Sequence, residues 1–151
     1  MNKRIAQLAA RLPEGGLDAF LVSTAENRRY LSGFTGSAGY LLITSDRLML
    51  FTDSHYTQQA SNQALDFEVA QIQGNGWDWL TEVLKESNAR RLGFESENMT
   101  VAAYHRMLDT LKEDQTLERI SLIPANSRYW CCRGTEGHQR PGRVGPLAEG
   151  H

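Results

Sequence analysis

The segment Tyr40-Leu41-Leu42-Ile43-Thr44-Ser45-Asp46-Arg47-Leu48-Met49-Leu50-Phe51 consists of two short apolar runs joined by four polar residues. Two such runs around a short polar turn predict a β-hairpin, in which neighbouring strands run antiparallel. A sheet that contains a hairpin is not purely parallel. The segment therefore predicts a sheet with at least one antiparallel pair of strands.

Helical and strand patterns alternate on both sides of this hairpin. Apolar residues recur at helical spacing in residues 5–12, 56–64, 77–84 and 100–111, and a further short helix is expected up to Leu31 from its capping residues. Short apolar or alternating runs predict further strands at 17–22, 67–72, 91–94 and 117–123. The expected N-caps of three helices are Ser23 or Thr24, Asp53 or Ser54, and Thr100. Strands that alternate with helices predict an α/β fold, with a mixed sheet flanked by helices on both faces.

The composition is that of an ordinary globular domain. The 151 residues are 40% hydrophobic and 23% charged, and the formal net charge is -2. This balance gives no strong attraction to nucleic acid or to an anionic membrane surface. The apolar stretches are too short to cross a bilayer, and the N-terminus lacks the apolar core of a secretion signal. Because the two cysteines, Cys131 and Cys132, are adjacent and form no disulfide framework, we expect a cytoplasmic protein.

The character of the chain changes after Asn126. Residues 127–151 contain four arginines among five glycines and two prolines, and no helical or strand period continues. Such a composition buries too little apolar surface to form a core. We therefore expect a domain at residues 1–126 and a divergent, disordered tail at residues 127–151.

The segment Gly33-Phe34-Thr35-Gly36-Ser37-Ala38-Gly39 is a glycine-rich loop, which raises the question of a phosphate site. A P-loop requires a lysine after its last glycine, and no lysine lies between Gly33 and Arg47. The spacing also differs from the dinucleotide fingerprint and from the G-x-S-x-G nucleophile turn. Two interpretations remain, a structural turn or a binding loop for a small anionic ligand.

Metal-ligating patterns are weak in this sequence. No H-E-x-x-H motif occurs, and His55 has Asp53 as its only neighbouring ligand type, whereas a catalytic zinc site uses three protein ligands. Asp18, Asp53 and Glu95 each lie near the end of a predicted strand, where carboxylates of α/β enzymes gather. A carboxylate-dependent nuclease with two metal ions is therefore an alternative function. We expect no metal site among the residues of this chain.

Three segments together resemble one protein family. Residues 27–39 (NRRYLSGFTGSAG) resemble the N-x-R-Y-L-[ST]-G-F-T-G-S-A-G signature of Xaa-Pro aminopeptidase N-terminal domains. Residues 52–60 (TDSHYTQQA) are similar to the family's T-D-[GS]-R-Y…Q-A segment, and residues 92–104 to its G-[FI]-E…[LM]-[ST]…Y stretch. Their order and separation also match. The chain is therefore identified as similar to the N-terminal domain of creatinase/prolidase-type metallopeptidases, up to about Asn126.

This resemblance implies an architecture and a division of labour. It implies a creatinase N-terminal-like domain with ribonuclease-H-like layers, followed in the family by a pita-bread catalytic domain. There, two Asp, one His and two Glu hold a pair of divalent metals (manganese, cobalt or zinc), and a bridging hydroxide attacks the Xaa-Pro bond. We expect that catalytic domain to be absent from this chain and the chain to be inactive alone. The match ends at Asn126-Ser127, as a shifted reading frame or a truncated gene would produce.

The resemblance also implies a non-catalytic role for this domain. In the family it forms contacts between subunits and lies at the rim of a partner subunit's active site, where a proline-containing peptide binds. Arginines can pair with a peptide carboxylate, and aromatic rings can line a proline-sized pocket. Relatives often carry arginine where this chain has His55, and a histidine would make that contact depend on pH. The rim residues that the resemblance implies are Arg29, Tyr30, Phe34, Asp53, His55 and Tyr56.

Overall fold

The computed structural model describes residues 3–74 and 76–125, and the predicted tail at 127–151 lies outside them. Its centre is one six-stranded mixed sheet with the strand order β4-β3-β2-β1-β5-β6. The strands are β1 (Ala19–Val22), β2 (Tyr40–Thr44), β3 (Leu48–Thr52), β4 (Glu68–Gln71), β5 (Arg91–Glu95) and β6 (Ser121–Ala125). The helices are α1 (Lys3–Glu14), α2 (Ala25–Ser32), α3 (Thr57–Gln63), α4 (Asp78–Ser87) and α5 (Val101–Lys112), with a short 3-10 helix at Gln115–Leu117.

The hairpin predicted from residues 40–51 is confirmed and occupies the middle of the sheet. Strand β2 pairs antiparallel with both β1 and β3, while the other strand pairs are parallel. All strands except β2 therefore run in the same direction. Consequently β1, β3, β4, β5 and β6 end at one edge of the sheet, which we call the carboxyl edge.

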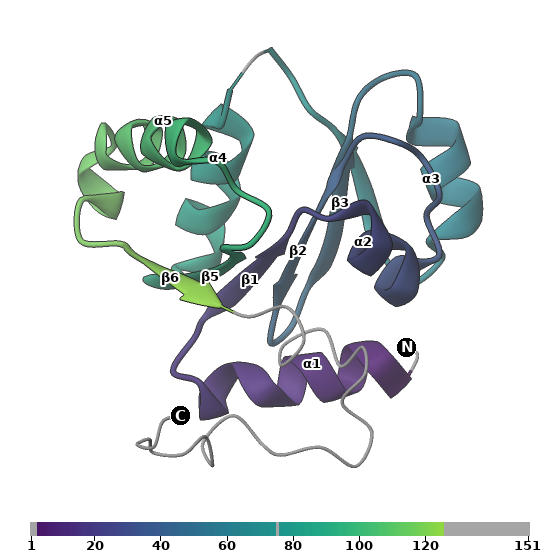
Figure 1. The fold of residues 1–151 in the computed structure, drawn as a ribbon, viewed down its shortest axis with the longest axis horizontal. Coiled ribbons are helices and arrows are strands. Elements are labelled where there is room, and N and C mark those ends of the chain that lie inside the picture. The colour runs from purple at the N-terminus through teal and green to yellow at the C-terminus, as the bar shows by residue number, and fades with distance from the viewer. Residues whose placement is uncertain (1–2, 75, 126–151) are drawn as a thin grey trace.

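Apolar side chains alternate between the two faces of the sheet and form two cores. On β1, Phe20 and Val22 pack with α1, α2 and α3, whereas Ala19 and Leu21 pack with α4 and α5. Figure 1 shows α4 and α5 on one side of the sheet and α2 and α3 on the other. The prediction of helices on both faces is thus confirmed. Among the described residues, no helix has the length and apolar character needed to cross a membrane.

Two details of the predicted secondary structure are wrong. Asp53 and Ser54 do not cap α3, because the Asp53 carboxylate accepts the His55 N–H at 2.9 Å within a turn and the helix begins at Thr57. The last strand does not begin at Leu117, which lies in the 3-10 helix with its side chain buried in the second core. Leu117 is apolar because its side chain is buried in this core, although it does not belong to a strand.

The 3-10 helix is held by Asp114, which gives a testable dependence of stability on pH. The Asp114 carboxylate accepts the Thr116 N–H at 2.9 Å and lies 3.0 Å from Lys85 Nζ on α4. Hydrogen bonds from Thr116, together with Lys85, lower the pKa of Asp114 from 3.8 to about 2. A lowered pKa in the folded state stabilises the fold above pH 3.8, and this stabilisation is lost as the pH falls towards 2.

We therefore expect Asp114→Asn to lower the melting temperature near neutral pH and to have a progressively smaller effect below pH 3.8. Thermal unfolding followed by circular dichroism across this pH range measures the difference between variant and parent. Asp109→Asn, at an exposed position of α5, is the matched control and should show no such trend. A difference for Asp114→Asn that stays constant with pH would contradict the assignment.

Candidate functional site

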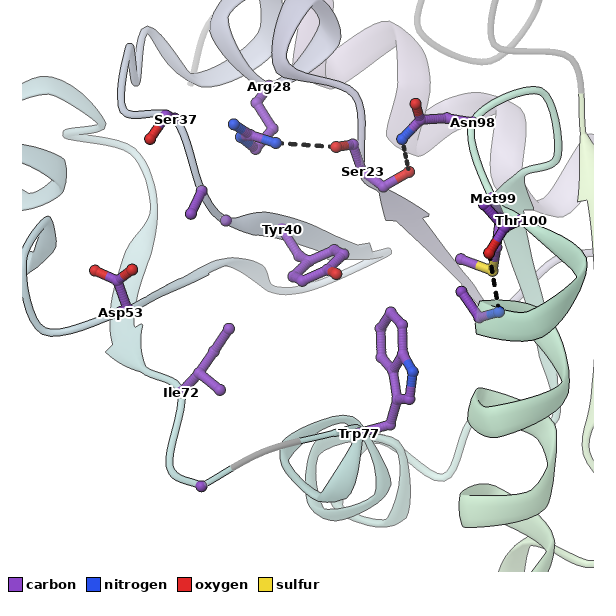
Figure 2. Close-up of a pocket in the computed structure, with 14 residues that line it drawn as sticks. Ser23, Arg28, Ser37, Tyr40, Asp53, Ile72, Trp77, Asn98, Met99 and Thr100 are labelled. Carbon is purple, nitrogen blue, oxygen red and sulfur yellow. Dashed lines mark hydrogen bonds between the residues drawn. The ribbon is translucent and has the colours of Figure 1, made fainter.

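A cavity of about 450 Å³ opens at the carboxyl edge of the sheet. Its walls come from the segments that follow β1, β3, β4 and β5 and from the loop that precedes β2. The edge where parallel strands end is the usual position for a ligand in open α/β sheets, because the connecting loops diverge there. Figure 2 shows side chains from these segments around one space, with Tyr40 at its centre.

One wall of this cavity is aromatic and apolar. The Tyr40 and Trp77 rings lie 5.2 Å apart between centroids, with planes inclined by 58°. Ile72 and Met99 extend the apolar surface on either side. Trp77 is buried in the second core together with Trp79 and Phe51, which fixes its orientation. The wall is thus a rigid surface onto which a planar or branched apolar group can pack.

Arg28 supplies a buried positive charge beside that wall. Its side chain is only 4% exposed, and its two Nη atoms donate to the backbone oxygens of Ser23 and Gly36 at 2.9 and 3.0 Å. Its Nε has no hydrogen-bond partner. Burial lowers the pKa of the Arg28 guanidinium, an effect that Tyr40 and Glu95 partly offset. An arginine remains protonated despite such a shift, so a buried cation that is largely shielded from solvent borders the cavity.

Glu95 is the anchor that holds the start of α2 against the sheet. The carboxylate is 1% exposed and accepts the N–H groups of Ser23 and Thr24 at 2.5 and 2.7 Å. It also accepts the Asn27 side-chain amide at 2.5 Å. Ser23 and Thr24 directly precede α2, so the carboxylate satisfies N–H groups at the start of the helix and interacts favourably with the helix dipole. This network fixes α2, and with it Arg28, relative to β1 and β5.

The glycine-rich loop of residues 33–39 forms part of the cavity. Two of its glycines are required by backbone conformation or by close packing. Gly33 ends α2 with φ 85°, a conformation that favours glycine. A Cβ on Gly36 would overlap the ring of Phe34 and lie 2.9 Å from Cδ1 of Tyr56. Ser37, Ala38 and Gly39 face the cavity. The loop is therefore a close-packed turn whose second half borders the cavity.

The three predicted rim residues on or next to α2 lie away from the cavity. Phe34 is 1% exposed and packs in the first core, so its side chain offers no surface to a ligand. Tyr30 is half-buried, and the Arg4 guanidinium lies 4.0 Å from its ring centroid. Arg29 is exposed and borders a shallow surface depression with Arg4, Glu26 and Tyr30.

The other three predicted rim residues form the turn between β3 and α3, at the carboxyl edge. Asp53 lines the cavity, and its Oδ1 lies 3.5 Å from Nδ1 of His55. The His55 side chain is 85% exposed. The Tyr56 hydroxyl is 2.6 Å from Oγ of Ser37, which ties this turn to the glycine-rich loop. The structure thus brings Asp53, His55 and Tyr56 together and separates them from Arg29 and Tyr30.

The carboxylates Asp18, Asp53 and Glu95 do not meet at one site, so the geometry that the nuclease alternative requires is not present. Asp18 precedes β1 and its Oδ2 accepts the N–H groups of Arg90 and Arg91 at 2.9 and 3.0 Å. Glu95 ends the parallel strand β5, at the opposite edge of the sheet. No group of three or more His, Cys, Asp or Glu side chains that could hold a metal ion occurs in residues 3–74 and 76–125.

The sequence patterns did not predict that Arg28, Tyr40 and Trp77 border one cavity. A signal for Arg28 was present, because Thr24, Asn27 and Arg28 share the helical spacing that places Leu31 in the core. Asn27 and Arg28 are therefore polar side chains on the inward face of a helix, which indicates that they have buried partners. The proximity of Trp77, which lies 49 positions along the chain from Arg28, depends on the order of strands in the sheet and leaves no trace in local periodicity.

The comparisons with known proteins agree with this fold. The family profile of the Creatinase/Prolidase N-terminal domain matches residues 4–129. The Bacillus subtilis protein named Uncharacterized peptidase YqhT is 37% identical over 89 residues, which are 59% of this chain and 25% of that protein. Xaa-Pro aminopeptidase 1 of Dictyostelium discoideum is 28% identical over 130 residues, which are 75% of this chain and 20% of that protein. This chain thus spans about a quarter or less of these two relatives.

Solved structures of relatives match most of the described fold. The N-terminal domain of the cytoplasmic peptidase PepQ from Mycobacterium tuberculosis has a TM-score of 0.74 and 37% identity, covering 84% of this chain and 95% of that one. The Xaa-Pro dipeptidase from Bacillus anthracis has a TM-score of 0.73 and 33% identity, covering 83% of this chain and 33% of that enzyme. Because the family profile covers most of the sequence, this chain belongs to the Creatinase/Prolidase N-terminal domain family.

Proposed function

We propose that this chain is the non-catalytic N-terminal domain of an Xaa-Pro peptidase, and that it contributes to oligomerisation and to the rim of a partner subunit's active site. The observation that carries the proposal is the turn at Asp53–Tyr56, which presents an 85% exposed histidine beside a carboxylate at the carboxyl edge of the sheet. The relatives that support it are an Xaa-Pro aminopeptidase and an Xaa-Pro dipeptidase, each several times longer than the matched segment.

His55 and Asp53 are the groups of this turn that suit contact with a peptide. A protonated His55 can pair with a peptide carboxylate, and its Nδ1 lies 3.5 Å from Oδ1 of Asp53. The hydrogen bond between Tyr56 and Ser37 at 2.6 Å holds the turn against the rest of the domain. In this proposal the divalent metal pair and the peptide-cleaving residues belong to a catalytic domain, and the protein acts in the cytoplasm on proline-containing peptides.

The proposal predicts that the purified chain hydrolyses no Xaa-Pro dipeptide or tripeptide, with or without added manganese. Release of the N-terminal amino acid, followed by chromatography, is the measurement. The Bacillus anthracis dipeptidase assayed in parallel shows that the conditions support catalysis. Metal-dependent cleavage by this chain would overturn the non-catalytic assignment.

The rim role can be tested in a chimera, in which residues 3–125 replace the matching domain of the Bacillus anthracis dipeptidase. We expect His55→Ala in that chimera to raise KM for Xaa-Pro substrates by about three- to tenfold with little change in kcat, since a single exposed charged contact is lost. His105→Ala removes another exposed histidine, on α5, and should leave KM unchanged. Equal kinetics for both variants and the parent chimera would contradict a rim role for His55.

Oligomerisation is tested separately by light scattering of the purified chain over a range of concentrations. The proposal predicts self-association into dimers or tetramers. A monomer at all concentrations would contradict the contribution of this domain to assembly, without affecting the kinetic test of the rim.

A further inference from the structure

We propose that the outer side of strand β4, which faces away from β3, pairs with the same strand of a second copy of this chain. The two strands run antiparallel across a two-fold axis at Ala70, and the two sheets continue into one sheet of twelve strands, six from each copy. The inference rests on the self-association proposed above and names the surface that carries it.

The first support is the direction of the backbone groups of β4. The N–H of Ile72, directly after the strand, donates to the oxygen of Thr52 at 2.8 Å and therefore points toward β3. Because successive residues of a strand point these groups to opposite sides, those of Ala70 also face β3, whereas those of Val69 and Gln71 face outward. Since β4 is the last strand on this side, the outward groups meet no other strand of the described residues. Such a strand is a template for pairing with another chain.

The second support is the low charge along this side of the domain. Residues 57–73 comprise α3, β4 and the connection between them, and their only charged residues are Asp66 and Glu68, in a chain that is 23% charged. Glu68 is already paired with Arg47 at 3.0 Å. Leu65, in the same segment, is 82% exposed. Depletion of charge is typical of the core of an interface, whereas strands that must stay unpaired usually carry lysine or proline.

The third support is that β4 is complementary to itself in one register. With Ala70 opposite Ala70 of the second copy, Val69 lies opposite Gln71, and each of these two pairs exchanges two hydrogen bonds. These bonds use the groups that face outward. A register centred on Val69 would instead require the N–H of Phe67, which already donates to the oxygen of Ala64 at 3.1 Å.

The side chains in this register place no like charges opposite each other. Alanine is small enough for the axis, where Cα atoms of an antiparallel pair approach to about 4.5 Å. Glu68 lies opposite Ile72 of the other copy, so the two Glu68 residues are about 14 Å apart along the strands, beyond the screening length at physiological salt. The last strand on the other side of the sheet, β6, contains Pro124, which has no N–H to donate to a further strand.

A disulfide across the axis tests the register directly. In the 151-residue chain with Cys131→Ser and Cys132→Ser, Ala70→Cys brings two Cα atoms within the separation that a disulfide requires. We expect oxidised glutathione to convert most of this variant to a covalent dimer on a non-reducing gel. Glu68→Cys, exposed on the same face of the strand, is the matched control and should stay largely monomeric, since its two thiols are about 14 Å apart. Equal cross-linking of both variants, or of neither, would overturn the pairing.

Sedimentation velocity separates failure of this inference from failure of the proposed self-association. Ala70→Lys places two positive charges opposite each other at the axis and should raise the Kd of the dimer at least about tenfold. Ala102→Lys adds the same charge at an exposed position of α5 and should leave this Kd unchanged. A chain that dimerises as tightly after Ala70→Lys would place the interface elsewhere and overturn this inference alone. A parent chain that stays monomeric would overturn the proposed self-association as well.

Discussion

Replacement of Glu95 by alanine is expected to lower the free energy of unfolding by about 3–5 kcal/mol. The buried carboxylate accepts hydrogen bonds from the Ser23 and Thr24 N–H groups and from the Asn27 amide. Its removal leaves these donors without an acceptor in a buried environment. It also removes a negative charge that favours the protonated form of Arg28. Denaturation by urea, followed by circular dichroism, measures the loss.

Glu95→Gln separates the shape of this side chain from its charge. Glutamine keeps one acceptor oxygen for the Ser23 and Thr24 N–H groups, but its amide group faces the amide of Asn27. We expect a loss of about half that of the alanine variant, because one acceptor and the charge are missing. Glu113→Ala, at an exposed position directly after α5, is a control that should change stability little. A Glu95→Ala protein as stable as its parent would refute the anchoring role.

Replacement of Phe34 by alanine is expected to cost about 3–5 kcal/mol of unfolding free energy. Phe34 is 1% exposed, and its ring meets that of Tyr56 edge-on, with 6.1 Å between the centroids. Alanine would leave a cavity between the glycine-rich loop, α2 and α3, where close packing around Gly36 allows little collapse. The measurement is again urea denaturation, and Phe34→Leu should cost less because it fills more of the space.

This second result also distinguishes two roles for Phe34. A residue that acts only at the rim of a partner's active site would change kinetics and leave stability unaltered. Replacement of a core residue instead lowers the stability of the domain, and it does so in the absence of any partner subunit. Unchanged stability of Phe34→Ala would contradict the core assignment and return Phe34 to the rim.

The fold was largely predictable from the sequence because its signals are local. The hairpin at residues 40–51 follows from two apolar runs around a polar turn, and Thr24 and Thr100 are the N-caps that their positions before helices predict. The predicted cap of α3 was wrong, because the Asp53 side chain accepts the N–H of His55 two residues later and so forms a turn in place of a helix cap. The prediction that the last strand begins at Leu117 was wrong, because a short apolar pattern does not distinguish a buried turn from a strand.

The sequence by itself determined the order of helices and strands, the mixed sheet and the family resemblance, since each depends on residues close together in the chain. Only the tertiary structure decided which polar residues share a site. Glu95 meets Ser23 across 72 positions, and Arg28 and Trp77 border one cavity because parallel strands end at the same edge. Periodicity specifies which face of a helix or strand is buried, but the residue opposite that face is set by strand order and packing.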